Sequence, residues 1–297
     1  MFSFLRSSSL CCRIIGWLGA TLAALLLGGC STVKFGYGHA PDLSYWWLDS
    51  YLELSDAQSA KVRTELTQLL AWHRSSELPR TAQLLKELQG AAAAPISAQR
   101  ACALATELRA HLNPLFTKAE PVAAELALSL SAVQIQHLER RLSKNNAEYR
   151  EKWGDGSAQE RLERRLKASV GGYENLYGKL EAAQLSALQA SVAGSDYDVE
   201  RSLAERRARQ QDLLQTLRRI ANGGTPMPDV RAQLRAVLER SLDPMHASHS
   251  AYSIRLAQQS CETFSAVHNA ATTPQRERAV RRLAAYERDA RELAAPP

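Results

Sequence analysis

The stretch that most directly indicates the fold is residues 130–153, LSAVQIQHLERRLSKNNAEYREKW. Its apolar side chains, among them Ile135 and Leu138, recur at the spacing that places them on one side of an α-helix. Ser131 and Gln134 form a capping box: the hydroxyl accepts from the backbone N–H three residues on, and the glutamine side chain reaches back to the N–H of the serine. The stretch therefore predicts a helix that begins immediately after Ser131.

The same signature recurs at Ser55–Gln58 and Thr272–Gln275, with variants at Ser157–Glu160 and Glu181–Gln184. Each cap stabilises its helix by about 1 kcal/mol. The spacings between the copies are irregular, which does not favour a simple tandem array. We interpret the repeated signature first as a set of helix starts.

The composition of the chain favours the same fold class. The 297 residues are 45% apolar and 23% charged, with 15 Gly and 11 Pro, which excludes disordered and collagen-like chains. Aromatic residues make up only 6%, and no stretch alternates apolar and polar residues as a strand does. We predict an all-α bundle of roughly ten helices. The predicted helices span residues 42–53, 55–75, 97–112, 114–130, 131–153, 157–172, 181–192, 196–220, 229–242, 244–268 and 272–293, with a short piece ending near Gln89, breaks at Pro79 and from Gly90 to Pro95, and a kink or division at Pro121.

The first residues have the pattern of an export signal. Arg6 and Arg13 precede an apolar run that is too short for a comfortable membrane span. The run ends in LGGC at residues 27–30, which resembles the lipobox of bacterial lipoproteins. The resemblance implies that Cys30 is acylated and that the chain is cut before it, whereas an ordinary cleaved signal or an uncleaved helix are the alternatives.

This resemblance implies a division of the chain into a signal peptide (1–29), an acylated cysteine with a tether (30–41) and a helical periplasmic domain (42–297). A turn at residues 154–156 would divide that domain into two lobes. Because Ser rather than Asp follows Cys30, the resemblance further implies the periplasmic face of the outer membrane rather than the inner membrane. The expected contacts are the membrane, through the lipid on Cys30, and an unknown periplasmic protein or envelope component. The net charge of +6 gives no case for nucleic acid.

Two cysteines remain after Cys11 and Cys12 leave with the signal and Cys30 is acylated. Cys102 and Cys261 would lie in an oxidising compartment, so we predict a disulfide between them. Two separate buried thiols are the alternative.

A second resemblance spans most of the chain after the signal. Residues 36–52, GYGHAPDLSYWWLDSYL, and residues 72–79, WHRSSELP, resemble the opening of an uncharacterised proteobacterial lipoprotein family, a domain of unknown function. The resemblance implies an acylated, helical periplasmic protein and supplies no functional residue. The capping boxes also resemble the Leu-Thr-x-x-Gln motif of periplasmic chaperones of the Spy and CpxP type, although only the motif is similar.

The densest aromatic group is Tyr45, Trp46, Trp47 and Tyr51, close to the lipidation site. Trp47 and Tyr51 are four residues apart and so share a helix face. These rings either anchor the first helix in the core, the interpretation we favour, or contact the membrane interface, which indole and phenol rings prefer.

A polar group follows at Trp72, His73, Arg74 and Glu77. His73 and Glu77, four residues apart, could form a general base or half of a metal site. Neither site has its third group nearby in the sequence, and a helix-end hydrogen bond explains the pair equally well.

Two further groups carry a functional alternative. His246 and His249 are spaced for one helix face, with Asp243 before them and His268 beyond, a set that zinc would accept. A solvated or core role is favoured, because no third ligand is known. The arginines at 201–219 either pair with neighbouring carboxylates, as we favour, or contact an anionic surface.

No nucleophile elbow, phosphate loop or dinucleotide-binding glycine pattern appears in the sequence. We therefore expect no enzyme and no cofactor, and we expect a binding module, chaperone-like or scaffold, at the outer membrane. The alternative is a metal-dependent or histidine-based hydrolytic enzyme at His246 and His249.

Overall fold

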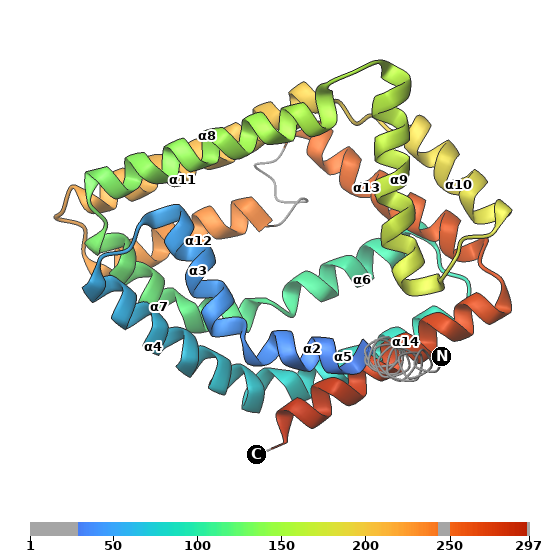
Figure 1. Ribbon diagram of the computed structural model, residues 1–297, viewed down its shortest axis with the longest axis horizontal. Coiled ribbons are helices and arrows are strands. Elements are labelled where there is room, and N and C mark those ends of the chain that lie inside the picture. The colour runs from blue at the N-terminus through green and yellow to red at the C-terminus, as the bar shows by residue number, and fades with distance from the viewer. Residues whose placement is uncertain (1–28, 243–249, 296–297) are drawn as a thin grey trace, which may run out of the picture. The chain divides into compact units, whose positions relative to one another are not determined.

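The computed structural model describes residues 29–242 and 250–295 (Figure 1). The predicted all-α bundle is confirmed, and the described residues contain no strand. The helices are α2 (Gly29–Gly38), α3 (Ala40–Leu52), α4 (Asp56–Trp72), the π-helical turn η1 (His73–Glu77), α5 (Leu78–Ala93), α6 (Ala98–Ala110), α7 (Asn113–Ser129), α8 (Ala132–Gly154), α9 (Ala158–Tyr177), α10 (Ala182–Ala193), α11 (Val199–Ala221), α12 (Met227–Leu242), α13 (Ala251–Asn269) and α14 (Thr273–Ala294).

The chain separates into two compact units, residues 1–40 and residues 41–297. In the first unit the described part is α2, so the segment predicted as a tether is helical from Gly29 to Gly38. The second unit holds the helices from α3 onward.

Helix α4, the turn η1 and helix α5 form one uninterrupted helix over residues 56–93. The break predicted at Pro79 is therefore wrong. The break predicted from Gly90 to Pro95 is present, but it begins only at Ala94, whose backbone is extended. Pro79 is tolerated because it occupies the first turn of α5, directly after a π-turn in which the N–H of Leu78 donates to the carbonyl of His73. Helix α7 also runs as one span through Pro121, so the chain is not divided there.

The helices of the second unit fall into two halves with the same order. In the first half, α3 to α8, capping boxes begin the second and the last helix, at Ser55 and Ser131. In the second half, α9 to α14, the corresponding helices begin at Glu181 and Thr272. The signature that the sequence repeats at irregular spacing thus marks equivalent places in two halves of six helices each.

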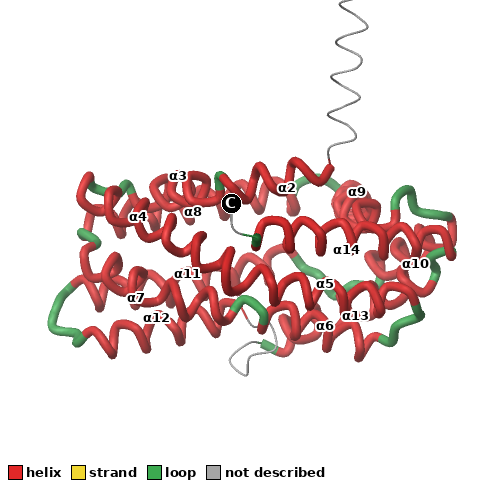
Figure 2. The backbone as a smooth tube through the Cα atoms, turned by 90° about the horizontal axis from the view of Figure 1, so that it is seen from below, coloured by secondary structure: helices red, strands yellow, loops and turns green. Residues whose placement is uncertain are grey.

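The two halves exchange their middle helices. Helix α5 of the first half packs along α14 of the second, and α11 of the second packs along α8 of the first (Figures 1 and 2). Reciprocally again, α6 packs on α13, and α12 packs on α7. Each half therefore depends on a pair of helices from the other for its core.

The buried side chains follow this exchange. One core joins α3, α7 and α8 to α11 and α12, with Leu138, Leu217 and Val230 among its members. A second core joins α9, α10, α13 and α14, around Tyr177 and Leu188. A third, smaller core lies between α6 and α13, beside the two paired cysteines.

Equivalent positions in the two halves carry different cross-links. Cys261, eleven residues before Thr272, forms a disulfide with Cys102 that joins α13 to α6, with a Cα–Cα distance of 5.3 Å. Glu120, eleven residues before Ser131, forms ion pairs of 2.6 Å with Arg231 and Arg235 that join α7 to α12. Each half thus links one of its own helices to a helix from the other half, through a disulfide in one case and through ion pairs in the other.

Candidate interaction sites

The glutamines of the first two capping boxes meet each other. Gln58 accepts the N–H of its own cap Ser55 at 2.9 Å, and its Nε2 donates to the carbonyl of Ser129 at 3.0 Å. Gln134 donates its Nε2 to Oε1 of Gln58 at 2.7 Å and to the carbonyl of Glu53 at 3.1 Å. The two boxes therefore join the starts of α4 and α8 as well as capping them.

The glutamines of the boxes at Glu181 and Thr272 also reach other segments of the chain, through backbone carbonyls. Gln275 donates its Nε2 to the carbonyl of Lys179 at 2.8 Å, two residues before Glu181, just as Glu53 lies two residues before Ser55. Gln184 is completely buried and its Nε2 lies 3.4 Å from the carbonyl of Val267. These amides face inward, so the motif shared with periplasmic chaperones serves the internal packing of this chain.

The predicted aromatic group divides between the core and the surface. Tyr45 is buried, donates its hydroxyl to Oγ of Ser59 at 3.0 Å, and has the Arg63 guanidinium 3.4 Å from its ring centre. Tyr51 packs beside the first core and its hydroxyl accepts from Nδ2 of Asn145 at 2.6 Å. The core interpretation therefore holds for the two tyrosines.

The core interpretation is wrong for the two tryptophans. Trp46 is 61% exposed and Trp47 is 60% exposed, and Leu43, on the same face of α3, is 51% exposed. The helical period explains the division, because positions 43, 46 and 47 lie opposite Tyr45 and Leu52, which point into the protein.

The polar group at residues 72–77 lies in the middle of the long helix, so the interpretation as a helix-end hydrogen bond is wrong. The side chain of Glu77 is buried and lies 3.8 Å from the guanidinium of Arg80. Burial lowers the pKa of His73, against the opposing effect of the Glu77 charge, and a nearby His111 lowers it further. His111, at the end of α6, also places its Nε2 3.0 Å from Oγ1 of Thr81. Sequence spacing missed His111, which is 30 residues from Thr81 along the chain.

Trp72 and Arg74, the other members of that group, also have interaction partners. Lys118 of α7 lies 6.0 Å from the ring centre of Trp72. Within residues 29–242 and 250–295 no three His, Cys, Asp or Glu side chains are arranged to hold a metal ion. His246 and His249 lie outside the described residues.

His268, considered above as a partner of that histidine pair, has another role. Its Nε2 lies 2.8 Å from the carbonyl of Ala94, which can only accept, so Nε2 carries the proton and Nδ1 accepts from the Tyr177 hydroxyl at 2.7 Å. The ring is 1% exposed, and burial lowers its pKa while raising that of Tyr177. Both ring nitrogens are thus used by the fold.

The favoured interpretation, pairing with carboxylates of α11 itself, holds for Arg209, which lies 3.9 Å from Glu205. Other arginines of this helix contact neighbouring helices instead. Arg218 pairs with Glu139 at 2.6 Å, and Arg206 donates to Oδ1 of Asn146 at 2.9 Å. Arg201 lies over the ring of Tyr252, 4.4 Å from its centre. These contacts bind α11 to α8 and α13.

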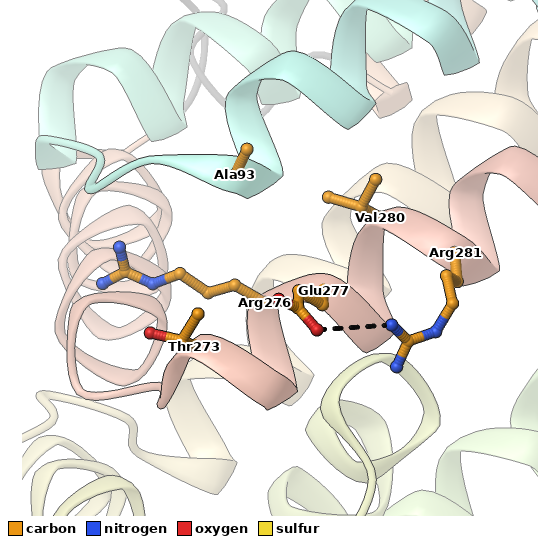
Figure 3. A pocket seen from close by; sticks show the side chains of 6 residues that line it. All are labelled: Ala93, Thr273, Arg276, Glu277, Val280 and Arg281. Carbon is orange, nitrogen blue, oxygen red and sulfur yellow. Dashed lines mark ion pairs between the residues drawn. The ribbon is translucent and has the colours of Figure 1, made fainter.

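A pocket of about 400 Å³ lies between α5 and α14 (Figure 3). Ala93 and Val280 provide apolar wall, and Glu277 and Arg281 form an ion pair of 3.5 Å beside them. Arg276 extends along the other side of the opening and donates to the carbonyl of Asn269 at 3.2 Å. The sequence pattern did not indicate this pocket, since its walls come from residues about 180 positions apart.

Residues 1–28, which include most of the predicted signal, and the side chain of Cys30 lie outside the described residues. Over the described residues, none of the helices combines the length and the apolar character needed to cross a membrane.

Comparison with protein families matches residues 50–250 to a family of unknown function, DUF6279. No curated protein and no solved structure matches the chain.

Proposed function

The chain belongs to the DUF6279 family, and we propose that it is a lipid-anchored periplasmic protein that binds a protein or another component of the cell envelope. The observation that carries the proposal is the LGGC sequence at residues 27–30, followed within twenty residues by two tryptophans that point into solvent. An acylated Cys30 would hold the helical unit firmly at a bilayer, since each buried methylene contributes about 0.8 kcal/mol.

The proposed location is the periplasmic face of the outer membrane. Ser31 is the residue that supports this choice, by resemblance to sorted lipoproteins. The disulfide between Cys102 and Cys261 is compatible with an oxidising compartment.

Binding is favoured over catalysis by the way the polar side chains are used. The capping glutamines, His268 and the arginines of α11 all make contacts inside the fold. Among the described residues, the surface features that a partner could use include the exposed face of α3 and the pocket at Ala93 and Val280. A chaperone-like or scaffold role fits these features.

The location and the partner are tested together in intact cells. Protein carrying a photo-cross-linker at Val280 is compared with protein carrying it at Gln136, an exposed position outside the pocket. The proposal expects both in the outer-membrane fraction and expects a discrete cross-linked product from position 280 alone. Recovery of both in the soluble fraction, or the same products from both positions, would contradict it.

A chaperone-like role has its own test. The mature protein should suppress aggregation of an unfolded client protein at a near-stoichiometric ratio. If the light scattering of the aggregating client increases at the same rate with and without the protein, the chaperone-like role is contradicted and the scaffold role is retained.

A further inference from the structure

The exposed apolar side chains of the described residues are concentrated at one place in the sequence. Ten large apolar side chains are exposed, and five of them lie within residues 33–47: Val33, Phe35, Leu43, Trp46 and Trp47. Single exposed apolar residues are ordinary on a protein surface, but several on one face of a helix, as at Leu43, Trp46 and Trp47 in the second unit, mark a contact site.

Helix α3 has the pattern of an amphipathic helix that lies on a surface. Leu43, Trp46 and Trp47 share its outer face, while Tyr45 and Leu52 on the inner face are buried. Neither indole N–H has a hydrogen-bond partner among the described residues, and the ring of Trp47 lies 4.8 Å from that of Tyr51, between centres. An amphipathic ring with a free N–H is best accommodated where apolar and polar surroundings meet.

The position of these residues in the chain selects the surface. Trp46 follows Cys30 by sixteen residues, a separation of about 24 Å if helical and under about 60 Å if extended. A bilayer that holds acyl chains on Cys30 is therefore always within reach of α3, whereas a protein partner would have to compete for that face.

We propose that the face of α3 formed by Leu43, Trp46 and Trp47 inserts at the headgroup region of the bilayer that anchors Cys30. This inference rests on the proposed acylation and adds a second, noncovalent attachment, which fixes the orientation of the helical unit at the membrane surface.

The test uses the acylated mature protein reconstituted into phosphatidylethanolamine and phosphatidylglycerol vesicles with brominated acyl chains. The mature chain contains Trp46, Trp47, Trp72 and Trp153. The double variant Trp72→Phe/Trp153→Phe reports on the proposed face. The matched control Trp46→Phe/Trp47→Phe reports on the rest of the unit, and circular dichroism checks that both variants fold.

The proposal expects about a twofold loss of emission, with a shift to shorter wavelength, in the first variant and little change in the control. Unquenched emission from Trp46 and Trp47 in protein whose mass shows acylation would overturn the membrane contact and leave the anchor intact. Equal quenching of both variants would also overturn the membrane contact. So would a blue shift that appears without vesicles and depends on protein concentration, because it would indicate that a second copy of the chain covers this face. A protein without acyl mass contradicts the proposed function instead, and its free form should then show both tryptophans accessible to iodide.

Discussion

Gln134 donates its side-chain N–H to the side-chain oxygen of Gln58 at 2.7 Å, although the two glutamines are 76 residues apart. The contact is reciprocal, since Nε2 of Gln58 lies 3.4 Å from Oε1 of Gln134. Each amide also holds the N–H of its own cap residue, so one side chain serves both a local and a long-range function. The capping boxes thereby determine which helix starts lie together.

Substitution of Gln134 by Ala should therefore cost more than the loss of an ordinary cap. It removes the bond to the N–H of Ser131 and takes the side-chain donor away from the carbonyl of Glu53, a destabilisation of about 2–3 kcal/mol. Urea unfolding followed by circular dichroism measures it. Gln136→Ala, at an exposed position of the same helix, is the control, and equal midpoints for the two variants would contradict the long-range role.

Glu120 should be the most costly single acid to neutralise. Glu120→Gln keeps the shape but removes the charge that holds Arg231 and Arg235, and we expect a loss of about 2 kcal/mol. Glu125→Gln, which breaks an exposed pair with Lys61, should change stability by less than about 1 kcal/mol. Similar losses from both variants would show that burial of Glu120 does not strengthen its contacts.

The same carboxylate should make stability depend on acid pH. Burial alone would raise the pKa of Glu120, but the hydrogen bonds and charges of Arg231 and Arg235 outweigh it and lower the pKa. The unfolded chain therefore binds this proton more readily, so the stabilisation is present above the unfolded pKa, near 4.5, and is lost as the pH falls through the folded value. The free energy of unfolding, measured from pH 6 downward, should fall less steeply in Glu120→Gln than in the wild type.

The buried His268 should make the free energy of unfolding depend on pH in a higher range than Glu120 does. Its folded pKa lies below the ordinary 6.5, mainly because of burial, so the unfolded state binds more protons below that pH and stability decreases as the pH falls. His268→Gln should flatten this decrease as the pH falls below 6.5, without abolishing it, since the pKa of His73 is lowered as well. His39→Gln, in the first unit, is the control, and an unchanged profile in His268→Gln would contradict a neutral buried imidazole.

Removal of the disulfide should destabilise the contact between α13 and α6. Cys102 and Cys261 are 159 residues apart in sequence, and in the chain-entropy model closure of such a loop contributes about 4–5 kcal/mol. Cys102→Ser/Cys261→Ser should therefore unfold at a much lower urea concentration than the oxidised protein. A midpoint equal to that of the wild type would show that packing alone holds the exchanged helix α6.

The sequence predicts the helices well because their signals are local. Ser55, Ser131, Ser157 and Thr272 begin helices in the structure as their capping boxes indicate. Pro79 misled the prediction, since a preceding π-turn lets the helix continue through it. The local sequence pattern does not indicate this π-turn, in which the N–H of Leu78 donates to the carbonyl of His73.

Local sequence patterns do not predict how the helices are arranged. The exchange of α5 and α6 for α11 and α12 rests on contacts between residues sixty or more positions apart, such as Arg206 with Asn146 and Glu120 with Arg235. The candidate sites show the same division. The aromatic group on α3 was visible in the sequence, but only the backbone phase of α3 decides that Trp46 and Trp47 face outward while Tyr45 faces inward.

The central claim, an anchor at Cys30, is tested most directly by the mass of the N-terminal tryptic peptide of protein extracted from membranes. The account predicts a peptide of residues 30–34, ending at Lys34, that carries diacylglycerol and a further acyl chain on Cys30. The Cys12→Ser variant should yield the same peptide, because that residue is removed with the signal, and Cys30→Ser should yield no lipid-bearing peptide. An N-terminal peptide that begins at another residue, or residues 30–34 without lipid, would contradict the account.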